Sequence, residues 1–459
     1  MIIFRESINY ILDITLIDTL DKLTSLMKEN NVSRLYAKVL ASNDNSKNQI
    51  YLGGDYSSLN IIPNLGVYAD DSKGNQGSKH DRFKANILFS WIDENGIYLA
   101  PKAQLIFYPQ YPEVRLSGIL MGCKQSPSKI IASRTTGRIL FFGVTEDKKI
   151  ISYAADQGSP LANELTLSLS KYEKTGVFHE ILFDNYDSKT SRILLLDTLR
   201  KIHQKGWIDS KRLSRGGILL ECNSGNCGGY TLEAELGINP NGIAGPDFHG
   251  WEVKQHNVRS FDKPGSSKAI TLMTPEPTAG FYKEYGVEQF LRKFGYKDKH
   301  GREDRINFGG IYRCNTRVIS TGLTMVLEGF NSTSSKIENV DGGIHLINDM
   351  NEIAAVWKFE DMMTHWNRKH AKCVYIPSLC RTEPCRQYYF GNIIQLAEGT
   401  DFIIFLKAIA SGKVYYDPAI KLEKASTAKP LQKRRSQFRI KAGDINSMYH
   451  NVENHNLCD

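Results

Sequence analysis

Short apolar runs separated by clusters of turn residues occupy the first 188 residues and restrict what this region can fold into. Strand-like runs lie at residues 35–40, 50–52, 85–92, 104–108, 139–144 and 149–153. Turn clusters at 42–48 and 70–80 interrupt them. Many short strands at this spacing favour a closed or half-closed β-barrel over alternating β-α units. Residues 1–30 differ, because their apolar positions are spaced as in an amphipathic helix.

The pattern changes near residue 188. The segment 191–207 places Ile193, Leu196 and Leu199 at helical spacing and ends near Gly206. A chain of 459 residues also exceeds what one hydrophobic core usually organises. We therefore expect two domains, at residues 1–188 and 189–459.

Membrane and secreted classes fit this sequence poorly. No stretch approaches the roughly 20 apolar residues that cross a bilayer. The first 20 residues contain Arg5, Glu6, Asp13 and Asp18, which a signal peptide would not tolerate in its apolar region. The expectation is a cytoplasmic protein with no membrane partner.

The eight cysteines are too few for a disulfide scaffold, and reduced thiols are expected in the cytoplasm. Cys222 and Cys227 are spaced C-x4-C, and Cys373, Cys380 and Cys385 cluster later. Because paired C-x2-C knuckles are missing, buried or idle thiols are favoured over a zinc site.

Positive charge is concentrated near the C-terminus. The net charge is +8, and residues 413–441 contain nine lysines and arginines against two acids. Such a stripe is typical of a surface that contacts nucleic-acid phosphates. A solvated basic loop would explain it equally well if it stood alone.

The segment 225–257 carries the most informative chemistry. Residues 231–236 predict a short helix with Leu232 and Leu236 on its buried side and Gly237 as its end. Turn residues follow, and residues 251–256 then alternate apolar and polar as a half-buried strand does.

On that strand Glu252 and Lys254 share one face, and Asp247 enters from the preceding loop. Two converging carboxylates form an oxygen site of the kind that Mg²⁺ prefers. A neighbouring lysine can orient the attacking water and offset the growing charge on a phosphate. The set predicts phosphodiester hydrolysis, although D-x4-E-x-K alone also occurs in ordinary surface strands.

These residues resemble the catalytic core of the MvaI/BcnI restriction endonucleases and of the related repair nickase MutH. The resemblance covers about residues 192–441 and implies an α/β nuclease fold of the PD-(D/E)xK type. It makes Asp247 and Glu252 metal ligands and Lys254 the catalytic lysine. Glu233, fourteen residues before Asp247, becomes an outer acid, with Glu235 as its rival.

The resemblance continues downstream of residue 257 with fewer matching residues. It implies a catalytic role for His256, and DNA contacts from the residues that follow: Lys268, Arg368, His370, Arg435, Gln437 and Arg439. Arginine and glutamine suit guanine and adenine edges. Trp357, Phe359 and Trp366 are expected in the core. One departure is Asp417-Pro418-Ala419, where the family has an arginine shortly after the aspartate.

The N-terminal half resembles a different fold. Residues 37–63 and 133–138 are similar to the DNA-binding pseudobarrel at the N-terminus of EcoRII, shared with plant B-three transcription factors. This resemblance implies a mainly β effector domain. The expected DNA contacts are Arg82, Lys84, Arg115, Arg134 and Arg138.

Together the two resemblances imply a monomeric Type IIE restriction endonuclease of the bacterial cytoplasm. It would use Mg²⁺, nick each strand in turn at a CCNGG-type site, CCWGG in particular, and bind a second DNA copy through its N-terminal domain. A cognate methyltransferase is expected in the same restriction-modification system. The alternatives are a MutH-like repair nickase and an inactive sequence-specific DNA-binding regulator.

Overall fold

The computed structural model describes most of the chain. The described residues are 16–47, 49–70, 82–181, 183, 188–238, 247–262, 269–299, 301–367 and 370–459. Within these ranges no helix is long and apolar enough to cross a membrane. Residues 1–15 of the predicted N-terminal helix lie outside the described residues, and α1 (Leu20–Glu29) lies in the remainder.

The chain divides into two compact units. The first comprises Met1–Ile50, Ile87–Gln104 and Leu116–Tyr186, and the second comprises Tyr51–Asn86, Leu105–Arg115 and Asp187–Asp459. The predicted boundary at 188 would instead assign all of residues 51–115 to the N-terminal domain. It stays a prediction.

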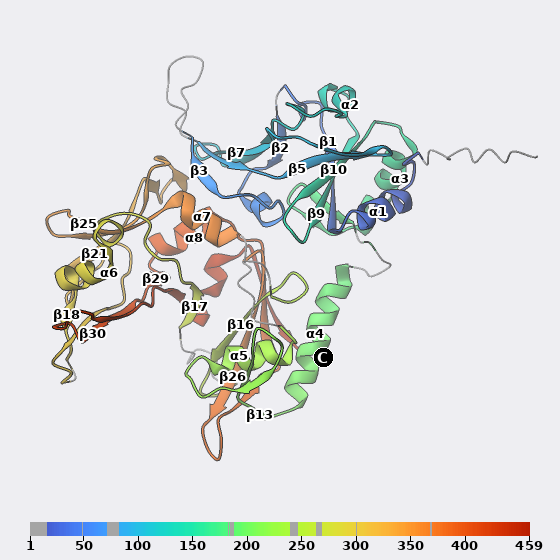
Figure 1. Cartoon of the computed structure of the whole chain (residues 1–459). Helices are drawn as coiled ribbons and strands as arrows, with labels where there is room; N and C mark the ends of the chain where they lie inside the picture. The colour runs from blue at the N-terminus through green and yellow to red at the C-terminus, as the bar shows by residue number, and fades with distance from the viewer. Residues whose placement is uncertain are drawn as a thin grey trace, which may run out of the picture. The chain divides into compact units, whose positions relative to one another are not determined.

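A seven-stranded sheet forms the first unit, in the order β11-β12-β1-β9-β10-β5-β6. Figure 1 labels β1, β5, β9 and β10 of this sheet. Its strands are β1 (Val32–Leu40), β5 (Phe89–Asp93), β6 (Gly96–Leu99), β9 (Arg138–Thr145), β10 (Ile150–Ala155), β11 (Lys174–Thr175) and β12 (Phe178–Ile181). Helices α1 (Leu20–Glu29) and α3 (Pro160–Ser168) contribute Leu23, Met27 and Leu165 to its apolar core. The short helix α2 (Ser128–Ala132) precedes β9.

A second, five-stranded sheet has the order β2-β8-β7-β4-β3. Its strands are β2 (Ile50–Gly53), β3 (Val67–Ala69), β4 (Phe83–Asn86), β7 (Gln104–Tyr108) and β8 (Glu113–Ser117). The runs predicted at 50–52 and 104–108 are strands here, whereas the run at 85–92 is split between β4 and β5. The chain changes sheets within that run, which local composition does not reveal.

The sheet that holds the candidate site consists of β13-β27-β26-β28-β33, with β16 paired in parallel to β26. Its strands are β13 (Ile208–Asp209), β16 (Glu252–Asn257), β26 (Lys372–Arg381), β27 (Gln387–Phe390), β28 (Ile393–Glu398) and β33 (Asn451–Asn456). Helices α4 (Ser188–Gln204) and α5 (Cys227–Glu235) share an apolar core with Trp251 and Val253. The helices predicted at 191–207 and 231–236 and the strand predicted at 251–256 are thus present as α4, α5 and β16.

The rest of the second unit contains small sheets and three helices. The strands are β14 (Lys211–Leu213), β15 (Leu219–Glu221), β17 (Ile270–Met273), β18 (Tyr296–Lys297), β19 (Arg305–Gly309), β20 (Arg317–Val318), β21 (Leu323–Glu328), β22 (Phe330–Asn331), β23 (Lys336–Ile337), β24 (Gly343–Asn348), β25 (Ile353–Lys358), β29 (Val414–Tyr416), β30 (Ala419–Glu423), β31 (Leu431–Lys433) and β32 (Phe438–Ile440). The helices are α6 (Phe281–Phe294), α7 (Phe359–Asn367) and α8 (Phe402–Ala410). Trp357, Phe359 and Trp366 are fully buried, as predicted.

Candidate active site

Strand β16 presents the two central residues of the site on one face. Glu252 is fully buried, and Lys254 Nζ donates to its Oε1. Trp251 and Val253 point into the core on the opposite side, as the alternation of the sequence predicted. Glu252 and Lys254 therefore form a contact pair on a strand that is fixed by packing from behind.

A tight turn returns Asp247 to the beginning of this strand. Phe248 and Trp251 exchange backbone hydrogen bonds of 2.9 and 2.8 Å, with His249 and Gly250 at φ of 44° and 87° between them. Both central residues are thus left-handed, as a type I′ turn requires. Asp247 Oδ2 then accepts the Val253 N–H at 3.1 Å, which fixes the carboxylate beside the strand.

Burial and mutual repulsion dominate the electrostatics of the site. Burial, followed by the negative charge of Glu252, raises the pKa of Asp247 to about 6. Burial is the largest single influence and lowers the pKa of Lys254, but the surrounding negative groups, Glu252 first among them, together outweigh it and the pKa is raised. The lysine therefore remains an ammonium group, while the two carboxylates repel each other and favour a bound cation.

The residues present fit a divalent metal ion. Glu252 Oε2 is buried and has no hydrogen-bond partner in the described part of the chain. A hard cation such as Mg²⁺ binds through few carboxylates and completes its coordination with water and phosphate oxygens. No set of three histidine, cysteine or acidic side chains suited to a metal gathers among the described residues. Asp247 and Glu252 would thus be the two protein ligands.

Helix α5 carries the two rival outer acids. Glu235 is held by Lys205, at 2.6 Å, and by Lys211. These two lysines neutralise the charge of Glu235. The role of an outer acid stays a prediction for both residues.

His256 lies two residues after Lys254, on the same strand face. Burial lowers its pKa to about 4, so its imidazole is neutral near neutral pH. Its Nδ1 is buried without a hydrogen-bond partner among the described residues. The predicted catalytic role of His256 is untested.

A buried thiol and two phenols border the site, and the sequence analysis missed them. The parallel register sets Cys373 opposite Glu252 and Tyr375 opposite Lys254. The hydroxyls of Tyr375 and Tyr449 lie 2.9 Å apart. The register between distant strands brings these groups together, and no local pattern in the sequence encodes it.

The expectation of reduced thiols is wrong for one pair. Cys222 and Cys227 form a disulfide that links the end of β15 to the beginning of α5. Their Cα atoms lie 5.7 Å apart, within the range that a disulfide spans without backbone movement. Helix α5 also begins earlier than predicted, because Gly228 lets it approach the Gln255 side chain on β16.

The predicted DNA contacts of the catalytic region have mixed outcomes. Lys268 and Arg368 lie outside the described residues. The prediction for His370 is wrong, because this side chain is fully buried, and its ring stacks on Trp366 with centroids 4.0 Å apart. Helical spacing alone could not distinguish a buried from an exposed histidine at the end of α7.

The three residues near the C-terminus remain candidates. Arg435 is exposed and Gln437 is half-buried. Arg439 on β32 donates to Asp417 Oδ2 at 2.6 Å and to the Ala269 carbonyl at 2.5 Å. Its guanidinium is therefore held in a defined orientation, partly exposed to solvent.

Among the predicted effector contacts, Arg138 is wrong. Its side chain is fully buried and donates to the carbonyl oxygens of Thr135, Ile130, Ala41 and Asp44 at 2.5–3.0 Å. This arginine is a structural support for the surrounding loops. An Arg-rich loop in the sequence does not show which arginine turns inward.

The other four arginines and lysines are accessible to different degrees. Arg82 and Lys84 both pair with Asp70, the latter at 3.0 Å. Arg115 pairs with Glu113 at 3.0 Å, and Arg134 is exposed. Their predicted contacts with DNA are untested.

A family model for the MvaI/BcnI restriction endonuclease family matches residues 196–449, more than half of the chain and all of the site described above. The chain belongs to this family. It is therefore a restriction endonuclease of Type II that hydrolyses DNA, in a family that generally uses divalent metal ions. A search of curated proteins found no match.

Solved structures of restriction enzymes are similar to the chain. MvaI with its cognate DNA is 17% identical, covering 57% of this chain and 97% of MvaI at a TM-score of 0.42. MvaI without DNA is 18% identical, covering 58% and 97% at a TM-score of 0.33. The B-three domain of the restriction endonuclease UbaLAI with cognate DNA is 18% identical, covering 34% and 99% at a TM-score of 0.20.

Proposed function

We propose that this family member cleaves DNA at a short CCNGG-type site, with CCWGG as its specific form, through one active site at Asp247, Glu252 and Lys254. The convergence of these three side chains on one face of β16 carries the proposal. A single site would nick the two strands in turn. The protein would then act as a monomer, with a cognate methyltransferase protecting the host DNA.

In this mechanism each residue has a distinct task. The Val253 N–H holds the Asp247 carboxylate, and Glu252 accepts from Lys254. The Lys254 ammonium orients the attacking water and offsets the charge that grows on the phosphate. Glu233 and neutral His256 would position water at the edge of the site.

Mg²⁺ is the proposed metal, held by Asp247 and Glu252. When bound, it would polarise the scissile phosphate and lower the pKa of a bound water. Since burial and Glu252 raise the pKa of Asp247, this carboxyl must lose its proton before it can act as a ligand.

Base recognition is proposed for Arg435, Gln437 and Arg439, with Lys268, Arg368 and the basic segment 413–441 contacting phosphates. The pairing of Arg439 with Asp417 orients its donors, which suits a directional contact with a base edge. The chain reads Asp417-Pro418-Ala419 where the family has an arginine shortly after the aspartate, so base contacts that differ from those of the family are proposed there.

The N-terminal half is proposed as an effector that binds a second DNA copy, as in the Type IIE enzyme UbaLAI. Its resemblance to the EcoRII pseudobarrel supports this role. Arg82, Lys84, Arg115 and Arg134 are the proposed contacts, and Arg134 is the best placed of them because it is exposed.

Incubation of plasmid with protein and Mg²⁺ tests the catalytic proposal. Discrete fragments preceded by nicked circles are expected, and run-off sequencing of their ends gives the site and cut position. Nicked circles that never become linear would favour a MutH-like nickase. Intact plasmid would contradict the proposal and leave a DNA-binding regulator.

Addition of a cognate oligonucleotide in trans tests the effector. Stimulated cleavage is expected, with Arg134→Gln reducing the stimulation more than the basal rate. The full chain is required, because the N–H groups of Val67 and Ala69 donate to Thr364 and Glu360, so a deletion of residues 1–188 would disturb α7. Cleavage that does not respond to the oligonucleotide would contradict the effector role.

A further inference from the structure

A four-stranded sheet in the second unit has one covered and one open face. The sheet has the order β18-β19-β30-β31. Phe308, Ile420 and Leu422 are buried, and Phe308 contacts Phe290 of α6 with ring centroids 4.7 Å apart. The opposite face borders a groove of about 480 Å³, lined in part by Tyr296, Asn307 and Lys421.

Polar side chains form a row across the open face. The register pairs Tyr296 with Asn307, Asn307 with Lys421, and Lys421 with Lys433. One donor or cation thus comes from each of the four strands. Neighbouring strands lie about 4.8 Å apart, so the row is about 14 Å long.

The positive charge of this row is only partly neutralised. Arg305, in the next row, pairs with Asp298 at 3.8 Å and with Glu423. Glu423 also pairs with Lys433 at 3.0 Å. For Lys421 the described part of the chain offers no ion pair. Like charges directly opposite each other destabilise a sheet, so the Lys421–Lys433 pair has a cost that an anionic ligand would relieve.

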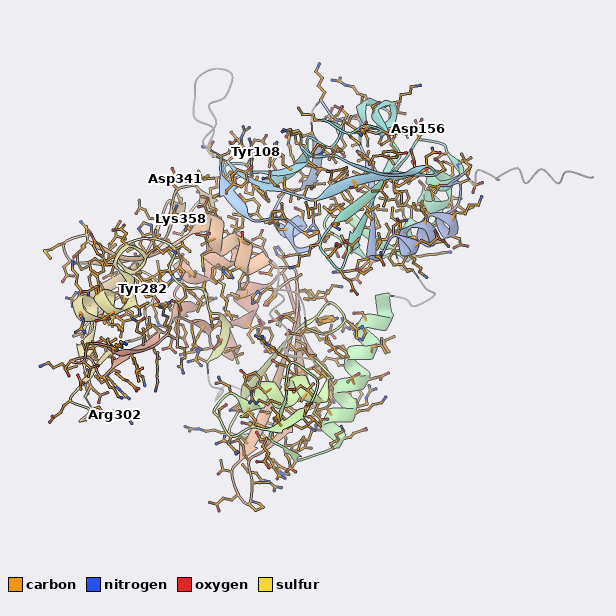
Figure 2. The ribbon with its side chains drawn as sticks, viewed as in Figure 1. Tyr108, Asp156, Tyr282, Arg302, Asp341 and Lys358 are labelled. Carbon is orange, nitrogen blue, oxygen red and sulfur yellow. A yellow bond between two sulfur atoms is a disulfide. The ribbon has the colours of Figure 1, made fainter. Side chains whose placement is uncertain are left out.

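Further cations lie at the rim of the groove. Lys299 Nζ lies 5.4 Å from the centre of the Tyr296 ring. Arg302 is exposed near the tip of the connection between β18 and β19, at the periphery of the second unit (Figure 2). Both line the groove together with Lys421, while Asp298 is the one acid among its lining residues.

We propose that this face binds the phosphodiester backbone of duplex DNA outside the recognised base pairs. The inference rests on the DNA-cleaving function of the family. Each DNA strand carries one charge per about 3.4 Å of helix axis along a backbone that winds around it, so a row about 14 Å long is long enough to contact more than one phosphate. Flexible lysines serve as point charges for phosphates and carry little base information. The face would strengthen binding to long DNA without contributing to sequence choice.

Length-dependent binding tests this surface. The double variant Lys421→Gln/Arg302→Gln and the matched control Lys283→Gln, an exposed lysine of α6 that does not line the groove, are compared with the wild type. Affinities are measured without metal for a duplex of about one helical turn and one of about four turns, both centred on the site identified by run-off sequencing, over a range of salt.

For the longer duplex, we expect the double variant to bind about tenfold more weakly and its log–log salt slope to fall by about one to two. The control should match the wild type on both duplexes. Unchanged affinity and slope on the longer duplex would overturn the proposal. An equal loss on both duplexes would also overturn it, since the cations would then act at the recognised pairs. If the proposed nuclease function itself failed, the result would be a different one: the wild type would leave both duplexes uncut in Mg²⁺.

Discussion

Arg138 in the first unit and Glu252 in the second are both charged, both on strands and both fully buried. Each nitrogen of the Arg138 guanidinium donates a hydrogen bond, and four backbone carbonyls accept them. Glu252 has one oxygen in contact with Lys254 and the other without a partner in the described part of the chain. A buried charged group whose polar atoms all have hydrogen-bond partners supports the fold. A buried carboxylate with one unpartnered oxygen marks a place where a ligand can complete the site.

Neutralising the Glu252 carboxylate should give the largest effect. Glu252→Gln preserves shape but removes the charge that would hold the metal, so we expect cleavage to fall by a factor of about a thousand or more in single-turnover assays. Glu235→Gln is the matched control, because the two lysines around it already neutralise this carboxylate on α5. Equal losses of cleavage in the two variants would contradict the special role proposed for Glu252.

Arg138→Met should act on stability instead of on DNA. The substitution leaves four carbonyls without their donor, and we expect the free energy of unfolding to fall by about 3 kcal/mol. Denaturant titration measures this change. Arg134→Gln, in the same loop but exposed, should change stability by less than about 0.5 kcal/mol. If Arg138→Met retained full stability but lost DNA binding, the DNA contact that the sequence predicted for Arg138 would be supported instead.

Asp247→Asn should stabilise the metal-free protein above neutral pH. The pKa of Asp247 is raised to about 6 from 3.8, so the native state holds this proton more tightly than the unfolded state. The stability that this proton gives is full below the unfolded value and is lost as pH rises through about 6. We therefore expect the free energy of unfolding of the variant to exceed that of the wild type by about 3 kcal/mol near pH 8 and nearly to match it near pH 4.

Thermal unfolding in a chelator at several pH values measures this difference. A gain in stability of Asp247→Asn that does not vary with pH would show that repacking around the new side chain causes it. A loss of stability at high pH would contradict the repulsion between Asp247 and Glu252.

Gly250→Ala should lower stability less than Arg138→Met does. Gly250 has φ of 87° in the turn that returns Asp247 to β16, and alanine in this conformation costs about 1 kcal/mol. Because the turn also positions the Asp247 carboxylate, the rate of cleavage should fall by more than the loss of stability alone would cause. Asn at this position, which tolerates left-handed backbone better, should recover part of the activity.

Local sequence patterns predicted the central part of the site well. The alternation of residues 251–256 determines which side chains of β16 face the core, and turn residues before it place Asp247 at the strand. These features depend on neighbours within about ten residues, where periodicity is informative. The strand-like runs of the first half were likewise recognisable, except where one run crossed from β4 to β5.

What the sequence could not show depends on distant partners. The pairing of β16 with β26 brings Tyr375 opposite Lys254 from more than a hundred residues away. The burial of Arg138 depends on the carbonyl oxygens of Ala41 and Asp44, which lie far from it in the sequence. The Cys222–Cys227 disulfide is local, but the spacing of the two cysteines alone does not show that their thiols meet. An exposed and a buried arginine are identical in a loop of basic residues until the packing is known.

The central claim, that Lys254 acts at a single metal-dependent DNA-cleaving site, is tested most directly by Lys254→Ala. Single-turnover cleavage and DNA affinity are measured on the same preparation, with Lys205→Ala as a control that removes a lysine from the salt bridge of Glu235. We predict that Lys254→Ala loses cleavage by a factor of about a thousand or more while its affinity for DNA changes by less than about fivefold. Cleavage by Lys254→Ala at the rate of the wild type would contradict the account.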